Sequence, residues 1–340
     1  MIRDIADSHK DVIRRLQGLA ADALQGAGGD AGFALVDYPD YANVGDSAIW
    51  LGTTEYFRLH AHREPQYVSA IADFDEAALR AAVPTGPILV NGGGNFGDLW
   101  PRHQDFRERL LERFADREII QLPQSLHFDD PARAQRAADA IERHGRFRLF
   151  VRDEWSYEFA TTQFACEVAL CPDMAVFIGD VDREAPNTDV LYLLRTDKEA
   201  ASHPAPGRSG YRKVVADWLT EPRLTIGMQR WRAMARGVVR GRRDRGSIRL
   251  AGFDGAAMAR VARGCELLSR GRVVITDRLH AHLLSFLLGI PHGVLDNSYG
   301  KLGRFLDLWM PDAPDVYRAG SLEDAERWAS TRLSGTEPRG

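Results

Sequence analysis

Residues 273–295 read VVITDRLHAHLLSFLLGIPHGVL. An apolar run of strand length, Val273–Thr276, comes first. A helical stretch, Leu279–Leu288, and a second short apolar run, Gly293–Leu295, follow it. Strands that are apolar on both faces and alternate with helices are typical of a parallel sheet covered by helices. This stretch therefore predicts an α/β fold.

The same alternation fills the first half of the chain. The runs expected to form strands are Gly32–Val36, Pro65–Val68, Pro87–Val90, Glu118–Leu122, Phe147–Val151 and Glu167–Leu170. Helical stretches lie near residues 47–59, 76–82, 103–114, 131–143 and 154–163. Apolar residues at helical spacing also predict a leading amphipathic helix over residues 2–25, which the glycine cluster at 26–29 ends.

A polar segment, Asp180–Thr188, separates this half from a second α/β region that begins with an expected strand at Asp189–Arg195. We therefore expect two Rossmann-like domains with parallel sheets, residues 1–182 and 189–340. The length of 340 residues fits two domains of about 150 residues each. In the second domain, the arginine-rich stretch Arg230–Arg249 is interpreted as a solvated helix end and loop. A patch facing an anionic membrane surface or substrate is the alternative.

Composition narrows the class of protein. The chain is 44% hydrophobic and carries a formal net charge of -4, which favours a folded protein and argues against a nucleic-acid partner. Its three cysteines fit a reducing compartment and buried thiols. No run of about 18 apolar residues and no signal-like leader occur. We expect a cytoplasmic protein whose only membrane contact is peripheral, at the inner face. The sequence leaves open whether it forms a homo-oligomer.

Four polar motifs follow expected strands in the first domain, at the strand ends where open α/β sheets bind ligands. The motifs are DYPDYANVGD at 37–46, NGGGNFGD at 91–98, QLPQSLH at 121–127 and VRDE at 151–154. The candidate substrate-binding residues on them are Asn43, Asp46, Gly93, Gly94, Asn95, Gln124, Ser125 and Arg152.

Each motif suits a different contact. The helix that opens after Asn43 offers free N–H groups to an anion or a hydroxyl. Consecutive glycines let the backbone come close to a ligand, yet the glycine motif is neither a P-loop nor a dinucleotide fingerprint. Gln124 and Ser125 can hydrogen-bond a sugar, and Arg152 can hold a carboxylate or phosphate. On the residues alone, a surface ion pair of Arg152 with a nearby acid is the favoured alternative.

The TDRLHAH motif at 276–282 carries the strongest chemical signal. Arg278 and His280 are expected in the first turn of a helix that directly follows a strand. An arginine, helix-end amides and a titratable imidazole together suit an anionic ligand that needs proton transfer. His280 and His282 are two residues apart and point to different faces, so they form no metal clamp. We therefore expect no metal.

Taken in order, these motifs resemble bacterial polysaccharide pyruvyl transferases. The resemblance runs from about Val36 to Leu308, with little of it between Pro204 and Gly252. The pieces that carry it are YPDYANVGDSAI (38–49), VNGGGNFGDLWP (90–101), IIQLPQSLHF (119–128), FVRDEWSY (150–157), CPDM (171–174) and VVITDRLHAHLLSFLLGIPHGVLDNSYGKL (273–302).

The resemblance implies a GT-B-like arrangement with the active site in the interdomain cleft. It implies transfer of pyruvate from phosphoenolpyruvate to a sugar, or to a lipid-linked oligosaccharide, usually as a cyclic ketal. The family's Arg-Leu-His element matches Arg278, Leu279 and His280, which would sit at phosphoenolpyruvate with His280 as acid/base. Arg152 would help to hold the donor anion. Asn43, Asp46, Asn95 and Gln124 would face the acceptor or the cleft wall. No cofactor is implied beyond the donor substrate.

Two other functions stay open on the sequence alone. A nucleotide-sugar glycosyltransferase of similar fold would need a glutamate for the ribose, for which Glu266 is the only nearby candidate. A non-catalytic scaffold of a polysaccharide assembly complex would give no reason for Arg278 and His280 to stand together.

Overall fold

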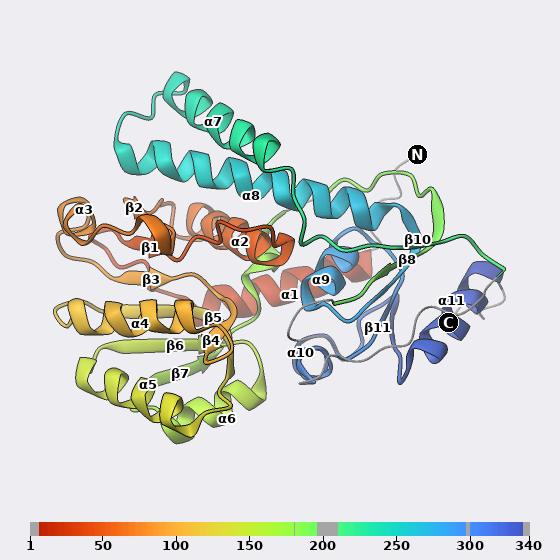
Figure 1. Cartoon of the computed structure of the whole chain (residues 1–340), viewed down its shortest axis with the longest axis horizontal. Helices are drawn as coiled ribbons and strands as arrows, with labels where there is room; N and C mark the ends of the chain where they lie inside the picture. The colour runs from red at the N-terminus through yellow and green to blue at the C-terminus, as the bar shows by residue number, and fades with distance from the viewer. Residues whose placement is uncertain (1–6, 180, 196–209, 297–299, 336–340) are drawn as a thin grey trace. The chain divides into compact units, whose positions relative to one another are not determined.

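The computed structural model describes residues 7–179, 181–195, 210–296 and 300–335. Within these ranges the chain folds into two compact units (Figure 1). Unit 1 takes its residues from Met1–Leu16, Gly179–Glu221 and Arg260–Gly340, and unit 2 from Gln17–Ile178 and Pro222–Ala259. This division differs from the expected domains, 1–182 and 189–340, because residues 222–259 pack with the first half of the chain.

Unit 2 is built on a seven-stranded sheet with the order β2-β1-β3-β5-β6-β7, and β4 pairs with β5 off this path. All of these pairings are parallel, as the sequence predicts. The strands are β1 Ala34–Val36, β2 Tyr67–Val68, β3 Ile88–Val90, β4 Gly93–Gly97, β5 Ile119–His127, β6 Phe147–Val151 and β7 Glu167–Leu170.

Helices bury both faces of this sheet. The helices are α2 Val44–His60, α3 Glu76–Ala82, α4 Pro101–Arg113, α5 Pro131–His144 and α6 Glu154–Gln163, with short 3-10 turns η1 Ile71–Asp73 and η2 Met174–Phe177. Unit 2 also contains α7 Arg223–Val239. One face packs with α3, α4, α5 and α6 into a single hydrophobic core. The alternate strand residues Leu35, Leu89 and Ile120 are also fully buried. The sheet is therefore apolar on both faces, as parallel sheets require.

The glycine-rich motif, expected to follow a strand, forms a strand of its own. β3 ends at Val90, residues 91–92 belong to no strand, and the chain then pairs with β5 as β4. Gly97 has φ 128, and a Cβ there would lie 1.7 Å from the carbonyl oxygen of His127. Only glycine permits this backbone conformation and this close approach. β5 correspondingly extends five residues past its expected end at Leu122.

Unit 1 is built on a five-stranded parallel sheet with the order β12-β11-β10-β8-β9. Its strands are β8 Thr188–Leu193, β9 Lys213–Val215, β10 Gly271–Thr276, β11 His292–Val294 and β12 Val316–Arg318, and its helices include α9 Leu279–Leu287, α10 Lys301–Trp309 and α11 Leu322–Ser334. The strand, helix and strand expected over residues 273–295 are confirmed. β9 and β12 were not expected. The α/β class with two parallel sheets is therefore confirmed.

Two helices pass from one unit to the other along the chain. The first, α1 (Asp7–Ala23), confirms the leading helix for the described part of its expected range, since residues 2–6 lie outside the described residues. The second is α8 (Arg245–Ser269). Among the helices of the described residues, none is both long enough and apolar enough to cross a membrane.

Gly52 sets how closely α2 approaches η2. A Cβ at this position would lie 1.8 Å from the carbonyl oxygen of Met174. We expect Gly52→Ala to lower the free energy of unfolding by about 1–3 kcal/mol, because the added methyl group forces backbone apart. Chemical denaturation measures this. Gly18→Ala, on the exposed side of α1 where nothing lies within 4 Å, is the matched control. It should stabilise by about 0.5–1 kcal/mol, as alanine does in an open helix, and an equal effect of both changes would contradict the packing argument.

Candidate functional site

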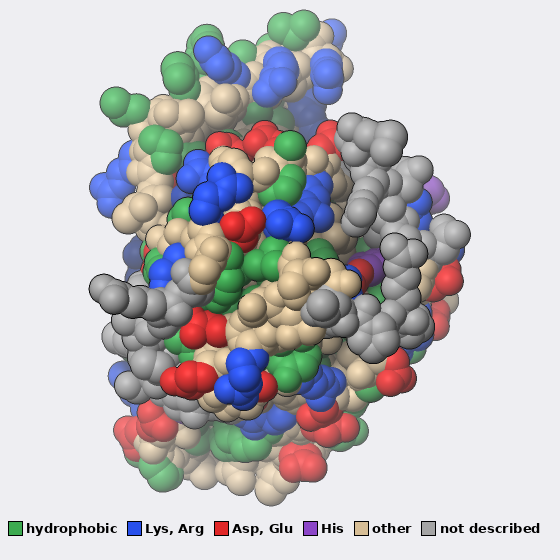
Figure 2. All heavy atoms as spheres, turned by 90° about the vertical axis from the view of Figure 1, so that its right-hand side faces the viewer, with side chains coloured by type: hydrophobic (Ala, Val, Ile, Leu, Met, Phe, Trp, Pro, Cys, Tyr) green, Lys and Arg blue, Asp and Glu red, His purple; other side chains and the backbone are tan. Residues whose placement is uncertain are grey.

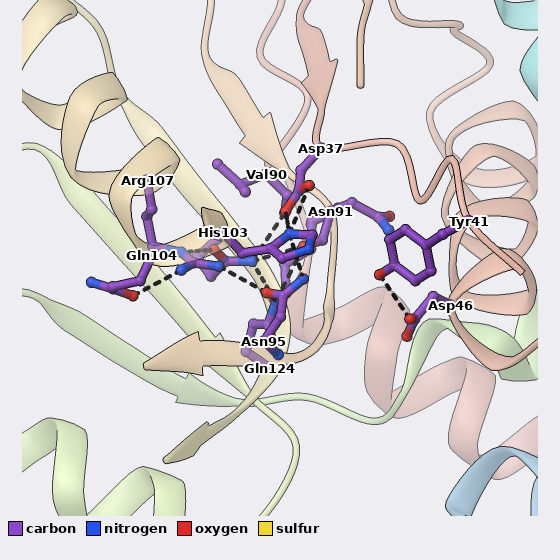
Figure 3. Close-up of polar contacts among 12 residues, drawn as sticks. Asp37, Tyr41, Asp46, Val90, Asn91, Asn95, His103, Gln104, Arg107 and Gln124 are labelled. Atoms are coloured by element: carbon purple, nitrogen blue, oxygen red, sulfur yellow. Dashed lines mark hydrogen bonds and ion pairs between the residues drawn. The ribbon is translucent and has the colours of Figure 1, made fainter. Parts of the chain in front are cut away.

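In unit 2, polar side chains gather beyond the carboxyl ends of β1, β3 and β5 (Figure 3). Asp37 follows β1 directly, is 3% exposed and has φ 66, a left-handed conformation that is uncommon outside glycine. Its carboxylate oxygens both lie 3.0 Å from Nδ1 of His103 on α4. A buried carboxylate that holds one nitrogen of an imidazole fixes the ring, as in catalytic carboxylate–histidine pairs. The Asp37 carboxylate therefore orients the His103 ring.

Asn95 on β4 connects this pair to the end of β5. Its Oδ1 accepts hydrogen bonds from Gln124 Nε2 at 2.9 Å and Arg107 Nη2 at 3.0 Å. Its Nδ2 lies 3.1 Å from His103 Nδ1, and its backbone N–H donates to Gln124 Oε1. Two of the predicted binding residues, Asn95 and Gln124, are thus held by each other (Figure 3).

Arg107 is the buried cation of this network. It is 1% exposed, its Nε donates to Gln121 at 2.6 Å, and its guanidinium lies 4.2 Å over the ring of Phe96. Burial lowers the pKa of Arg107 to about 10, against the opposing effect of the Asp37 and Glu108 carboxylates. The side chain therefore stays protonated at neutral pH and stabilises the polar groups around it.

The motif after β1 supplies a second carboxylate. Asn43 caps α2 by accepting from the N–H of Gly45, and its Nδ2 donates to Asp46 Oδ2 at 2.7 Å. The hydroxyl of Tyr41 donates to the same oxygen at 2.8 Å (Figure 3). A Cβ built on Gly93 would lie 3.6 Å from the other carboxylate oxygen of Asp46. The Asp46 carboxylate is thus oriented beside the glycine motif.

Arg152, at the end of β6, joins the remaining predicted residues. Its Nε donates to Ser125 Oγ at 2.9 Å, and its Nη1 pairs with Asp173 at 2.5 Å. A Cβ on Gly94 would lie 3.2 Å from its Nη2. The structure therefore brings all eight residues predicted in this half to one end of the unit 2 sheet. The ion pair expected as an alternative for Arg152 is present, but it is buried rather than superficial.

The ion pair between Arg152 and Asp173 yields a stability prediction. Both side chains are at most 6% exposed, so Asp173→Asn leaves a buried cation without its countercharge. We expect a loss of about 3–5 kcal/mol in the free energy of unfolding. Chemical denaturation of the full chain measures it. The control is Asp116→Asn at a site where the carboxylate is 58% exposed. It removes one of the two acidic partners of Arg80 and a carboxylate 3.4 Å from Arg117. That change should cost less than about 1 kcal/mol, and comparable losses would show that burial is not what matters.

In unit 1, the Arg-Leu-His element lies at the junction of β10 and α9, as predicted. Arg278 is the residue before the first turn of α9, and Leu279 and His280 begin the helix. The Arg278 side chain is 5% exposed, and its Nη2 donates to Asp217 Oδ1 at 3.0 Å. Its guanidinium also lies 5.9 Å from the ring of Trp218. Leu279 and His280 are half-buried. A cation, an imidazole and helix-end N–H groups therefore share one turn.

His282 points away from this turn, as its spacing predicts. It is fully buried, with Nδ1 2.7 Å from His292 Nε2 and Nε2 3.4 Å from the sulfur of Met310. Burial lowers the pKa of His282 well below its usual value, helped by the neighbouring His292. Burial likewise lowers the pKa of His292 to about 4. The two rings form a neutral pair in the core of unit 1.

This neutral pair makes stability depend on pH. Both histidines stay neutral in the folded state while the unfolded chain protonates them near pH 6.5, so stability is present above pH 6.5 and falls from there toward pH 4. Each histidine contributes a slope of about 1.4 kcal/mol per pH unit. Denaturation at a series of pH values measures it. Replacing both by glutamine should flatten the curve in this window, whatever the variant's stability at pH 8. An unchanged slope would contradict the burial argument.

Three other sets of residues could in principle bind a ligand or react: a cluster of possible metal ligands, Glu266 and the cysteines. Asp98, His127 and Asp129 bring ligand atoms within 4.8 Å of one another, but Asp98 Oδ2 already accepts from the N–H groups of residues 129 and 130. The expectation of no metal stays a prediction. Glu266, the ribose candidate of the glycosyltransferase alternative, is 55% exposed and pairs with Arg270. Cys171 and Cys265 are buried, as expected, whereas Cys166 is only partly buried.

Sequence analysis missed Asp37, His103 and Arg107 as site residues. Asp37 had one usable signal, since it is the first polar residue after β1. His103 and Arg107 lie four residues apart and so share one face of α4, but charged residues surround them in PRHQDFRERLLER. Nothing in that sequence shows which polar side chains turn toward the sheet.

Comparisons with known proteins concern the chain as a whole. The profile of the family described as polysaccharide pyruvyl transferase matches residues 43–299. Pyruvyl transferase 1 of Schizosaccharomyces pombe is 35% identical over 290 residues, which cover 82% of this chain and 69% of the relative. A Bacillus subtilis protein named as a pyruvyl transferase, EpsO, is 32% identical over 82% of this chain and 86% of its own length. General stress protein 30 of B. subtilis is 26% identical over 89% of this chain and 85% of that protein.

A solved structure supports the fold. The crystal structure of a functionally uncharacterised protein from Klebsiella pneumoniae superposes with a TM-score of 0.58 over 90% of this chain and 99% of that chain. The two sequences are 17% identical, so the likeness concerns the fold alone.

Proposed function

Because the chain belongs to the polysaccharide pyruvyl transferase family, we propose that it transfers pyruvate from phosphoenolpyruvate to a sugar of an exopolysaccharide or of its lipid-linked precursor. The product is a cyclic ketal, and phosphate is released. The observation that carries the proposal is the turn after β10, where Arg278 and His280 stand together at the N-terminus of α9. Family membership makes the chain a transferase, and the donor and the ketal are our inference.

The turn after β10 supplies what an enol phosphate donor needs. Phosphoenolpyruvate carries a carboxylate and a phosphate, and Arg278 with the first N–H groups of α9 offers fixed positive charge to such an anion. Asp217 orients the Arg278 guanidinium through one of its nitrogens. His280, half-buried in the same turn, is the titratable group. Leu279 completes the turn as an apolar contact.

The reaction balances with one histidine as both acid and base. Protonated His280 gives its proton to the methylene carbon of phosphoenolpyruvate, and C2 becomes electrophilic. A first sugar hydroxyl attacks C2 and passes its proton to the now neutral imidazole. The bond from C2 to the phosphate oxygen then breaks and phosphate leaves. A second hydroxyl adds to C2 and its proton goes to the released phosphate, while His280 keeps the proton of the first hydroxyl for the next cycle. Fixed positive charge stabilises the leaving phosphate. The scheme needs neither a metal nor an organic cofactor.

The end of the unit 2 sheet suits polyol and anion recognition. We assign Arg152 to binding of the donor. The residues assigned to the acceptor carry amide, hydroxyl and carboxylate groups, which match sugar hydroxyls; they are Asn43, Asp46, Asn95, Gln124 and Ser125. Gly93 and Gly94 keep the backbone open beside Asp46 and Arg152. The GT-B-like arrangement, the interdomain cleft and the cytoplasmic location stay predictions.

The first test is release of phosphate from phosphoenolpyruvate in the presence of a panel of sugar and lipid-linked oligosaccharide acceptors. We expect acceptor-dependent release by the wild type. In His280→Gln the rate should fall by about 10²–10⁴-fold, the usual effect of losing a positioned acid. The matched control is His62→Asn. His62 is exposed and has φ 49, a conformation that asparagine tolerates, so its replacement should leave the rate unchanged.

Ligand-induced stabilisation separates this proposal from its alternatives. Phosphoenolpyruvate should raise the melting temperature of the wild type, and less so that of Arg278→Lys, which keeps the charge but loses the guanidinium fork. Stabilisation by a nucleotide sugar instead would favour a glycosyltransferase. No stabilisation by either ligand, together with no phosphate release from phosphoenolpyruvate with any acceptor, would refute the transferase scheme and favour a scaffold.

A further inference from the structure

Helix α7 of unit 2 is held against α8 by one of its faces. A Cβ on Gly255 of α8 would lie 2.3 Å from Cβ of Ala233, and one on Gly252 would lie 2.7 Å from the side chain of Met234. Ile226 and Gly237, on the same face of α7, are buried. Glycines on one helix and small residues on the other thus allow close packing, which fixes how α7 is rotated about its axis.

The opposite face of α7 presents a row of large apolar side chains to solvent. Leu224 is 90% exposed, Trp231 69% and Val239 87%. The spacing of this row is that of a single helical face. We call it the apolar stripe, and its members are Leu224, Met228, Trp231, Val238 and Val239. Isolated exposed apolar residues are ordinary, but a continuous row on a helix marks a contact surface.

Positive charge flanks the apolar stripe. No aspartate or glutamate occurs between Arg223 and Arg243. Arg232 and Arg236 are exposed beside the stripe, and Arg240, Arg243 and Arg245 are exposed where α7 ends and α8 begins. Figure 2 shows hydrophobic and arginine side chains side by side at its upper end, where Figure 1 draws α7.

Not every arginine of the region takes part in this surface. Arg242 pairs with Glu64, and Arg249 pairs with Asp73, so these two stabilise unit 2 internally. The interpretation of Arg230–Arg249 as a solvated helix end and loop is thus correct for only part of the segment.

The positive charge beside the apolar stripe distinguishes two possible partners for it, a second copy of the chain and an anionic lipid surface. A second copy of the chain packing by the same face would bring two sets of arginines together without a single acidic partner from either helix. An anionic lipid surface provides the missing negative charge and also accepts the apolar side chains. A helix with Trp and Leu on one side, flanked by arginines, is the pattern of helices that lie in a membrane interface. Tryptophan itself prefers that depth.

We propose that α7 is an interfacial anchor that lies in the headgroup region of an anionic membrane, with the apolar stripe inserted and Arg232 and Arg236 at the lipid phosphates. This inference rests on α7 alone and does not depend on the proposed reaction.

The test is co-sedimentation of the full chain with vesicles of phosphatidylcholine containing phosphatidylglycerol. We expect binding that weakens as salt is added and that is much lower with phosphatidylcholine alone. Arg232→Gln with Arg236→Gln should weaken binding by about fivefold for each arginine. Leu224→Ser with Trp231→Ser should weaken it at least about tenfold. The matched control is Leu59→Ser, an exposed leucine of unit 2 on α2, which should bind like the wild type.

Light scattering on the protein without vesicles tests the alternative that a second copy of the chain packs against the apolar stripe. A dimer that becomes monomeric in Leu224→Ser with Trp231→Ser, without vesicle binding by the wild type, would overturn the proposal in favour of a second copy. Equal loss of binding in Leu59→Ser would also overturn it, because the effect would then not belong to the stripe. Since no arm of this test measures phosphate release, failure here leaves the proposed reaction to be judged by its own assay.

Discussion

A parallel strand cannot return to its neighbour through a tight turn, so strands that follow one another in the chain and pair in either sheet must be joined by a crossover over one face. β3 continues directly into β4 because these two strands do not pair with each other. The crossovers here are mostly helices, and they bury both faces of each sheet. The polar residues that the crossovers begin with are thereby left at one edge, beyond the carboxyl ends of the strands. The end of the unit 2 sheet and the Arg278–His280 turn of unit 1 are both products of this constraint. The alternation of strands and helices is enough to place both sets of residues.

The edge of the unit 2 sheet is held by its own polar groups. β4 runs beside β5 only because glycine allows the backbone at Gly97 to approach His127. That approach puts Asn95 within reach of Gln124 and Arg107, and Arg107 in turn is tolerated in the core because several oxygens surround it. A cluster of this kind is rigid before any ligand arrives, which reduces the entropy lost on binding.

The sequence predicted much of this arrangement because apolar runs and strand ends are local signals. β1, β6 and β10 lie where their apolar runs lie, and Arg152 and Arg278 follow their strands as expected. β4 was missed because GGNFG contains almost no strand-forming residues and is stabilised only by its partner. β9 and β12 were missed because they are three residues long and largely solvent-accessible. The Asp37–His103 pair joins residues 66 apart, a contact that no local pattern indicates.

Unit 1 assembles from segments that are far apart in the chain. His9 on α1 packs 4.6 Å from the ring of Phe286, and Arg15 donates to the carbonyl of Trp309, 294 residues later. A ribosome adds about 5–20 residues per second, so the start of α1 must wait about 15 to 60 s for its partners to be made. During that interval the start of α1 lacks these two partners, whereas strands β1 to β7 of unit 2 are all synthesised. The order of synthesis thus favours early formation of the unit 2 sheet and late closure of unit 1.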